Sequence, residues 1–217
     1  MAEGTIDAND AAEAAALRDA ARAIERARLV QIGSFHFVLV MGALTLWGAA
    51  EAWAQTTGFR IAGFAALANA LIAGTVIPST LHEWGHFAGA RLSGAVSPVL
   101  EEPRRHFFMF DFPMDKNDVR QFTWMSWGGI LAPWGVLLAA VLFVPLATAS
   151  AAVLFATLFA RAVAVSVFEV PVVRGAALSG QPAAELGARL EAGGLDQGRR
   201  LGVVAGLACF ALLWMAV

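Results

Sequence analysis

The sequence predicts an all-α polytopic membrane protein with about five transmembrane helices and a small β-hairpin-like insertion between the second and the third. Hydrophobic residues make up 59% of the 217-residue chain, only 15% of residues are charged, and the mean hydropathy is +0.65. Soluble domains average about 45–50% apolar and about 25% charged residues. Apolar runs of about 18 residues or more recur along the chain, and this length crosses a bilayer as a helix.

The first 28 residues predict a lead-in helix that precedes a membrane-embedded domain of residues 29–217. Ala, Glu, Leu and Arg dominate from Asp10 to about Arg28, and Asn9 or Asp10 can cap the first turn. We expect this helix to lie along the membrane surface. The apolar runs then place spans at about residues 29–53, 61–92, 127–146, 151–173 and 201–217, the last being barely long enough to cross.

Two polar stretches separate the later spans. Residues 94–125 contain Pro98, Pro103 and Pro113 together with charged clusters, which exclude a transmembrane helix there. The aromatic run His106–Phe112 within this stretch predicts one or two β-strands. The second polar stretch, residues 174–200, predicts a short helix at Pro182–Glu191.

Basic residues predict the orientation in the membrane. The N-terminal segment and the two long loops carry many Lys and Arg residues, whereas the opposite side has only Arg60. The positive-inside rule therefore places the N-terminus and both loops in the cytoplasm of a multi-pass protein of the plasma or inner membrane. The net charge of −2 argues against nucleic acid as a partner. The single cysteine, Cys209, excludes an internal disulfide and a cysteine-based metal site, and the acidic N-terminus predicts no cleaved signal peptide.

The strongest functional signal is the pattern His-Glu-x-x-His at residues 82–86, near the end of the second span. Residues four apart lie on the same face of a helix, so His82 and His86 can present two imidazoles to one metal ion. Glu83 lies about 100° round the helix, where its carboxylate can reach a water on that metal. The pattern is typical of zinc hydrolases with two His ligands and a Glu as general base. Ionisable groups inside a membrane are costly and usually functional.

Depth in the membrane predicts the third ligand. His82 and Glu169 lie about 13 Å and about 7 Å from the basic residues that end their spans, at 1.5 Å per residue. Both spans run toward the same side, so Glu169 can supply an oxygen ligand and leave a fourth position for water. His36 lies at comparable depth in the first span and competes for this role. Glu51 and Arg161 are expected to pair with other side chains or to extend toward the interface.

The motif helix, continued by Phe-Ala-Gly-Ala-Arg-Leu-Ser-Gly, resembles the site-2 protease family of intramembrane zinc metalloproteases. The resemblance covers residues 61–175. It implies a small β region after the motif helix, a third helix opening at Gly129, and a late helix with an acidic ligand. Pro133 stands where that family has Asn, and Arg174 stands where it has the ligand Asp, so Glu169 is the nearest carboxylate.

Motif and resemblance together predict a zinc metalloendopeptidase that hydrolyses a peptide bond in or near a transmembrane segment of a membrane-protein substrate. In this reading Zn²⁺ is held by His82, His86 and Glu169, and Glu83 is the catalytic base. The partners are then that substrate and the lipid bilayer. Two alternatives stay open: a catalytically inactive relative that acts as a membrane binding or scaffold protein, and a metal hydrolase acting on a lipid or a small amide.

Overall fold

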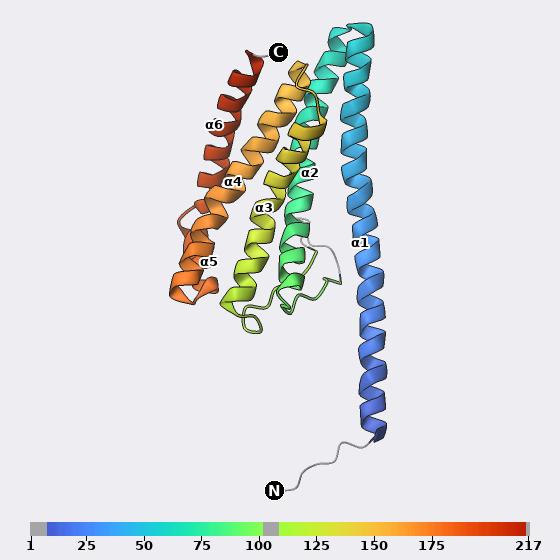
Figure 1. Cartoon of the computed structure of the whole chain (residues 1–217), viewed down its shortest axis with the longest axis vertical. Coiled ribbons are helices and arrows are strands. Elements are labelled where there is room, and N and C mark those ends of the chain that lie inside the picture. The colour runs from blue at the N-terminus through green and yellow to red at the C-terminus, as the bar shows by residue number, and fades with distance from the viewer. Residues whose placement is uncertain (1–7, 102–108, 216–217) are drawn as a thin grey trace.

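The computed structural model of the chain describes residues 8–101 and 109–215, and within these ranges every regular element is a helix. Helices α2, α3 and α4 pack against one another, α1 lies along α2, and α6 lies along α4, as Figure 1 shows. The helices are α1 (Ala8–Thr57), α2 (Arg60–Leu92), α3 (Val119–Phe143), α4 (Ala149–Ser179), α5 (Pro182–Glu191) and α6 (Gly194–Trp214).

Among the described residues, four helices, α1 to α4, are long and apolar enough to cross a membrane. The predicted fifth span is therefore wrong for the part of the chain that is described. Helix α6 reaches residues 194–214, but its first turns carry Asp196 and Arg200. The apolar remainder, Leu201–Trp214, is only about 20 Å long at 1.5 Å per residue, whereas a hydrocarbon core is about 30 Å thick.

The predicted β-hairpin-like insertion is also wrong within the described ranges. The predicted residues 106–108 lie outside those ranges. Residues 109–112 form no strand, and the only pairing described there is one isolated antiparallel bridge between Val99 and Phe110. On the Pro98 side the pairing stops because Pro98 has no N–H to donate to Asp111, whose own N–H bonds the Pro98 carbonyl.

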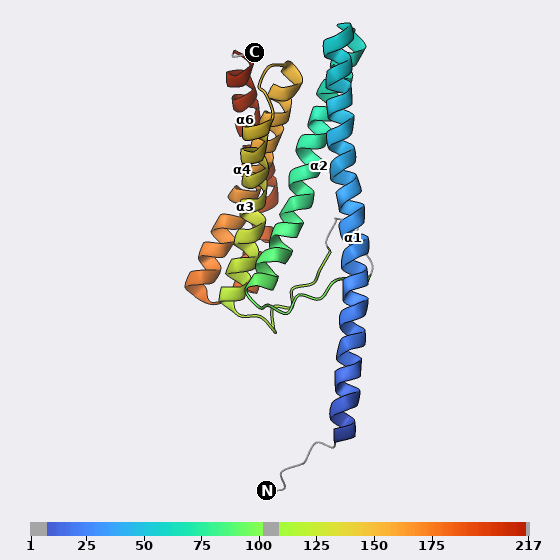
Figure 2. The ribbon, with the colours of Figure 1, turned by 45° about the vertical axis from the view of Figure 1, so that its right-hand side comes forward.

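The helices differ from the predicted spans mainly at their ends. Helix α1 continues through residues 28 and 29 without a break, so the lead-in segment and the first span form one helix that extends well beyond the bundle (Figures 1 and 2). Helix α3 begins earlier than predicted because Asp118 and Gln121 form a capping box. Helix α4 continues past Pro171 to Ser179, and α5 has the predicted bounds.

Small residues bring α2 and α3 into backbone contact. A Cβ atom added to Gly85 would overlap the backbone of Gly128, and one added to Gly128 would overlap the backbone of Gly85. Such small-residue contacts are a common way for helices to associate closely in lipid. The close approach places the carbonyl groups of α3 within reach of side chains on the motif face of α2.

Candidate metal centre

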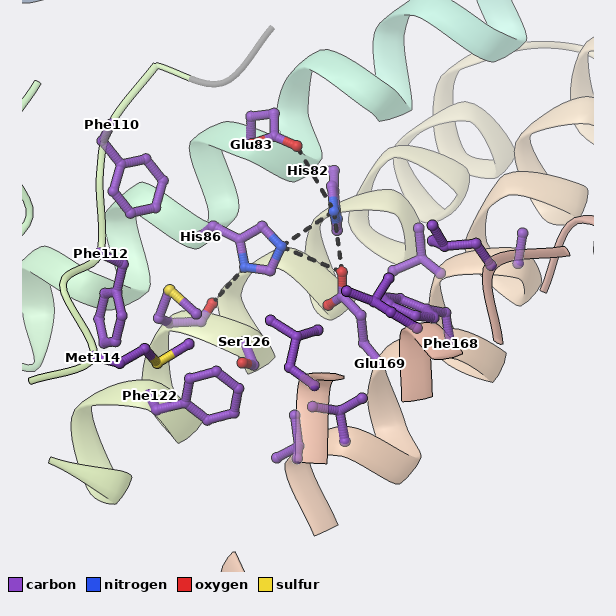
Figure 3. Close-up of a pocket in the computed structure, with 18 of the residues that line it drawn as sticks. His82, Glu83, His86, Phe110, Phe112, Met114, Phe122, Ser126, Phe168 and Glu169 are labelled. Carbon is purple, nitrogen blue, oxygen red and sulfur yellow. Dashed lines mark hydrogen bonds and ion pairs between the residues drawn. The ribbon is translucent and has the colours of Figure 1, made fainter. Parts of the chain in front are cut away.

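Two histidines of α2 and one glutamate of α4 converge on a single point, as Figure 3 shows. The Nε2 atoms of His82 and His86 are 3.1 Å apart. Oε1 of Glu169 lies 3.2 Å from the first of these nitrogens and 3.3 Å from the second. Three ligand atoms at these separations can all reach one ion at the usual metal–ligand distance of about 2.0–2.2 Å.

Backbone carbonyls of α3 fix the protonation pattern of the two rings. Nδ1 of His82 lies 2.9 Å from the carbonyl oxygen of Gly129, and Nδ1 of His86 lies 3.0 Å from that of Met125. A carbonyl oxygen can only accept a hydrogen bond, so both Nδ1 atoms must carry the hydrogen. In the neutral rings both Nε2 atoms then have a lone pair directed into the centre, which is the arrangement of metal-binding histidines.

With neutral rings the centre collects electron-pair donors without a hydrogen between them. Two imidazole lone pairs and the Oε1 atom of Glu169 then face one another, an arrangement that is repulsive unless a metal ion, or a proton on one of the rings, lies among them. The second oxygen of Glu169, Oε2, is buried and has no hydrogen-bond partner. The side chains of all three residues are only 15% exposed, so bulk water screens this repulsion poorly. His82, His86 and Glu169 thus form a group that can hold a metal ion.

Two helix prolines help to build the site. A proline in a helix leaves the carbonyl four residues before it without its helical partner. Pro133 of α3 frees the carbonyl of Gly129 in this way, and that carbonyl accepts the Nδ1 hydrogen of His82. Pro171 of α4 frees the carbonyl of Val167, which accepts a hydrogen bond of 2.8 Å from Nη2 of Arg189 in α5.

Glu83 lies beside the centre but does not join it. Its Oε1 atom is 4.0 Å from Nε2 of His82, and its side chain is 11% exposed (Figure 3). Glu83 is not part of the group whose ligand atoms all lie within 4.8 Å of one another. Its carboxylate is nevertheless close enough to contact a water that lies on the ion. The next residue on the helix, Trp84, points elsewhere and donates a hydrogen bond of 3.0 Å to Nδ1 of His36.

The centre opens into a cavity of about 630 Å³, a volume within the range of small-molecule sites. Its walls are mostly apolar and come from α2, α3, α4, α5, the first turns of α6 and the segment before α3. Phe110 and Phe112 of that segment lie near His86, and Ser126 and Phe122 of α3 line the same space (Figure 3). The cavity can accommodate an extended apolar chain next to the three ligand atoms.

The structure brings together His82, His86 and Glu169, and it sets Glu83 beside them. His36, the competing third ligand in the sequence, lies outside this group and accepts the hydrogen bond from Trp84. The sequence-based reading missed the part played by the Gly129 carbonyl. The signal was present, because Pro133 follows Gly129 by four residues within an otherwise regular helix.

The chain was compared with models of protein families, with curated proteins and with solved structures, and none of the three comparisons gives a match.

Proposed function

We propose that this chain is a zinc metalloendopeptidase that cleaves a membrane-protein substrate in or near a transmembrane segment. The observation that carries the proposal is the convergence of two imidazole nitrogens and one carboxylate oxygen beside the separate acid Glu83. Two imidazoles and a carboxylate are a catalytic zinc set that leaves one coordination position open. The resemblance of the motif helix to site-2 proteases supports the same assignment.

A zinc ion in this centre would supply Lewis acidity, both to the water that attacks and to the carbonyl that is attacked. Glu83 takes one proton from that water as its oxygen bonds to the carbonyl carbon. The carbon–nitrogen bond of the peptide then breaks, and Glu83 delivers the proton to the leaving amine. The α3 carbonyls hold both imidazole rings in place throughout, because each accepts the Nδ1 hydrogen of one ring.

The surroundings of the centre support a peptide of a membrane protein as the substrate. The cavity lies among helices that are apolar enough to cross a membrane, and its walls are largely apolar. A helical substrate hides its carbonyl groups in hydrogen bonds, so the segment that is cut has to be extended locally. We further propose the orientation that the basic residues predict, with the N-terminus in the cytoplasm.

Metal analysis and cleavage assays on the same preparations test this proposal. The purified wild-type protein and the Glu83→Gln variant are expected to contain one zinc per chain, because Glu83 is not a ligand. The wild type is expected to cut a mixture of synthetic transmembrane peptides, with products read by mass spectrometry. The variant should be slower by about 10²–10⁴-fold, the usual contribution of a general base.

Four outcomes would overturn the assignment. A metal-free wild-type protein would remove the metalloenzyme. Stoichiometric iron in place of zinc would point to oxygen chemistry, since two histidines and one carboxylate also bind iron in oxygenases. Stoichiometric zinc without cleavage of any peptide would favour the inactive binding or scaffold protein, and zinc-dependent hydrolysis of lipids alone would favour the lipid hydrolase.

A further inference from the structure

Arg161 is a cationic side chain in the middle of α4 that lines the same cavity as the metal centre. It lies about 18 Å along the helix from Ala149 and about 27 Å from Ser179. Ionisable residues at such depth are rare, and they usually face a protein interior and mark a functional site. The proposed zinc site accounts for Glu169 and Glu83 but leaves Arg161 unexplained.

Arg161 has no carboxylate partner among the described residues. Its Nη2 atom donates a hydrogen bond of 2.9 Å to the neutral hydroxyl of Ser79, and its Nε atom is buried without a hydrogen-bond partner. None of the ion pairs in the described ranges includes it. Glu169 is not its counter-ion, because Oε2 of that residue is also buried and unpartnered. A buried guanidinium with an unsatisfied N–H group is a place where an anion binds favourably.

A second arginine adds to the positive charge near Arg161. Arg199 of α6 lines the cavity as well, and its charge acts on Arg161. Its own contact with Asp196 is long, at 3.5 Å, and solvent-exposed, so that pair neutralises it weakly. Two like charges on one cavity repel each other, and a bound anion between them would relieve that repulsion.

The hydrogen bond to Ser79 places the guanidinium close to the reaction centre. Ser79 precedes His82 by three residues on α2, which is less than one turn and about 4.5 Å along the axis. An extended peptide advances about 3.3 Å per residue. In a substrate that lies across the metal centre, a group one to three residues from the scissile bond would therefore lie beside Arg161.

We infer that Arg161, assisted by Arg199, binds a carboxylate of the substrate close to the peptide bond that is cut. The carboxylate is either an Asp or Glu side chain or the free C-terminus of the peptide. This inference rests on the proposed function and defines its substrate class, which is an apolar segment with an acidic group near the cleavage site. A lipid phosphate fits less well, because Arg161 lies about 18 Å from the nearer end of α4 whereas headgroups stay at the membrane surface.

A binding assay tests the inference without catalysis. The zinc-loaded Glu83→Gln protein in detergent micelles is titrated into three versions of one short, fluorescently labelled apolar peptide. The first has a central Glu and an amidated C-terminus, the second has Gln at that position and the same amide, and the third has Gln and a free C-terminal carboxylate. A charge-assisted hydrogen bond predicts that the first or the third binds about tenfold or more tightly than the second, and the tighter one identifies the source of the carboxylate.

Variants then test whether Arg161 causes the preference for the carboxylate peptide. In the Glu83→Gln background, Arg161→Gln should reduce the preference to less than about threefold, and Arg161→Lys should keep part of it, because one point charge remains. Arg200→Gln removes a neighbouring arginine that does not line the cavity, and it should keep the full preference. A zinc content equal to that of the parent shows that each variant is folded. If the Arg161 variants do not fold, the comparison of the three peptides on the parent protein still tests the inference, because it needs no Arg161 variant.

The outcomes separate this inference from the proposed function. Equal affinity for the three peptides overturns the inference, even if the wild type cleaves all of them. Equal peptide affinity combined with displacement of the peptides by phosphatidylglycerol would assign the arginines to a lipid headgroup. A clear preference for a carboxylate in a protein whose wild type cleaves nothing would support the anion site and overturn the protease.

Discussion

Glu51 and Glu169 are two of the carboxylates among the apolar helices of this chain, and their surroundings are opposite in character. Glu51 of α1 is surrounded by hydrogen-bond donors: Nε2 of Gln55 donates to Oε1 at 2.8 Å, and the hydroxyl of Ser150 donates to Oε2. Trp47 in turn donates to that hydroxyl at 3.1 Å. Glu169 instead faces two imidazole lone pairs with one oxygen and has no partner for the other.

The difference separates a structural polar cluster from a site that needs a ligand. The cluster at Glu51 is satisfied by the protein itself, so it joins α1 to α4 and requires nothing further. The cluster at Glu169 is incomplete, because with neutral rings its three facing atoms are all acceptors and Oε2 of Glu169 has no hydrogen-bond partner. A cation supplies what is missing, and this predicts that removing either carboxylate affects a different property of the protein.

The largest expected effect follows from removal of a histidine ligand. His86→Ala should lower zinc affinity by more than about 100-fold, since even residues that only support a ligand contribute about 10–100-fold. His36→Gln is the matched control, because Gln can still accept the hydrogen bond from Trp84 and the ring is outside the metal group. Competition with a fluorescent zinc chelator measures both affinities. Loss of zinc in the His36 variant, with retention in the His86 variant, would reverse the assignment.

The comparison itself is tested by exchanging each carboxylate for its amide. Glu169→Gln should weaken zinc binding by about 10–100-fold, because a neutral amide replaces the charged ligand. Glu51→Gln should leave zinc affinity unchanged and lower the stability by about 1–3 kcal/mol, because an amide nitrogen would meet donors. Zinc affinity and thermal unfolding in detergent are measured for both proteins. Equal effects of the two changes on zinc affinity would contradict the distinction drawn between the clusters.

A smaller effect is expected from crowding of a ligand ring. A Cβ atom on Gly129 would overlap the imidazole of His86, so Gly129→Ala should displace that ring and weaken zinc binding by about tenfold. Gly135→Ala changes the same helix at a position with open space around the new methyl group, and it should leave zinc affinity unchanged. The same chelator competition compares them. Identical affinities for the two alanine variants would show that the ring is not held where α3 crosses α2.

The helices were predictable because apolar runs and caps are local properties of the sequence. The short helix Pro182–Glu191 has the predicted bounds, and the second span differs from α2 by one residue at its start. The β-insertion failed because aromatic residues favour strands by composition, whereas pairing depends on which N–H groups are free, and Pro98 has none. The fifth span failed because the apolar part of α6 is shorter than a membrane is thick.

The candidate metal ligands were predictable because residue spacing and depth in the membrane determine their positions. Helical spacing places His82 beside His86, and depth in the membrane brings Glu169 to the same level. Partners that depend on the crossing of helices could not be derived in this way. The bond of Arg161 to Ser79 and the carbonyls that orient the two rings depend on how α3 and α4 pack against α2, which a single sequence does not specify.

The smallest expected effect concerns Pro133, the proline inside α3 that frees the carbonyl of Gly129. Pro133→Ala restores the helical N–H that can bond the carbonyl of Gly129, and this N–H then shares that oxygen with the Nδ1 hydrogen of His82. A carbonyl has two lone pairs, so both bonds can form, and zinc affinity should fall by less than about tenfold. Pro78→Ala is the control, because the carbonyl that it affects, that of Gly74, holds no metal ligand. An unchanged zinc affinity in Pro133→Ala, within the error of the chelator assay, would show that the freed carbonyl does not orient His82 and that packing against α3 alone does so.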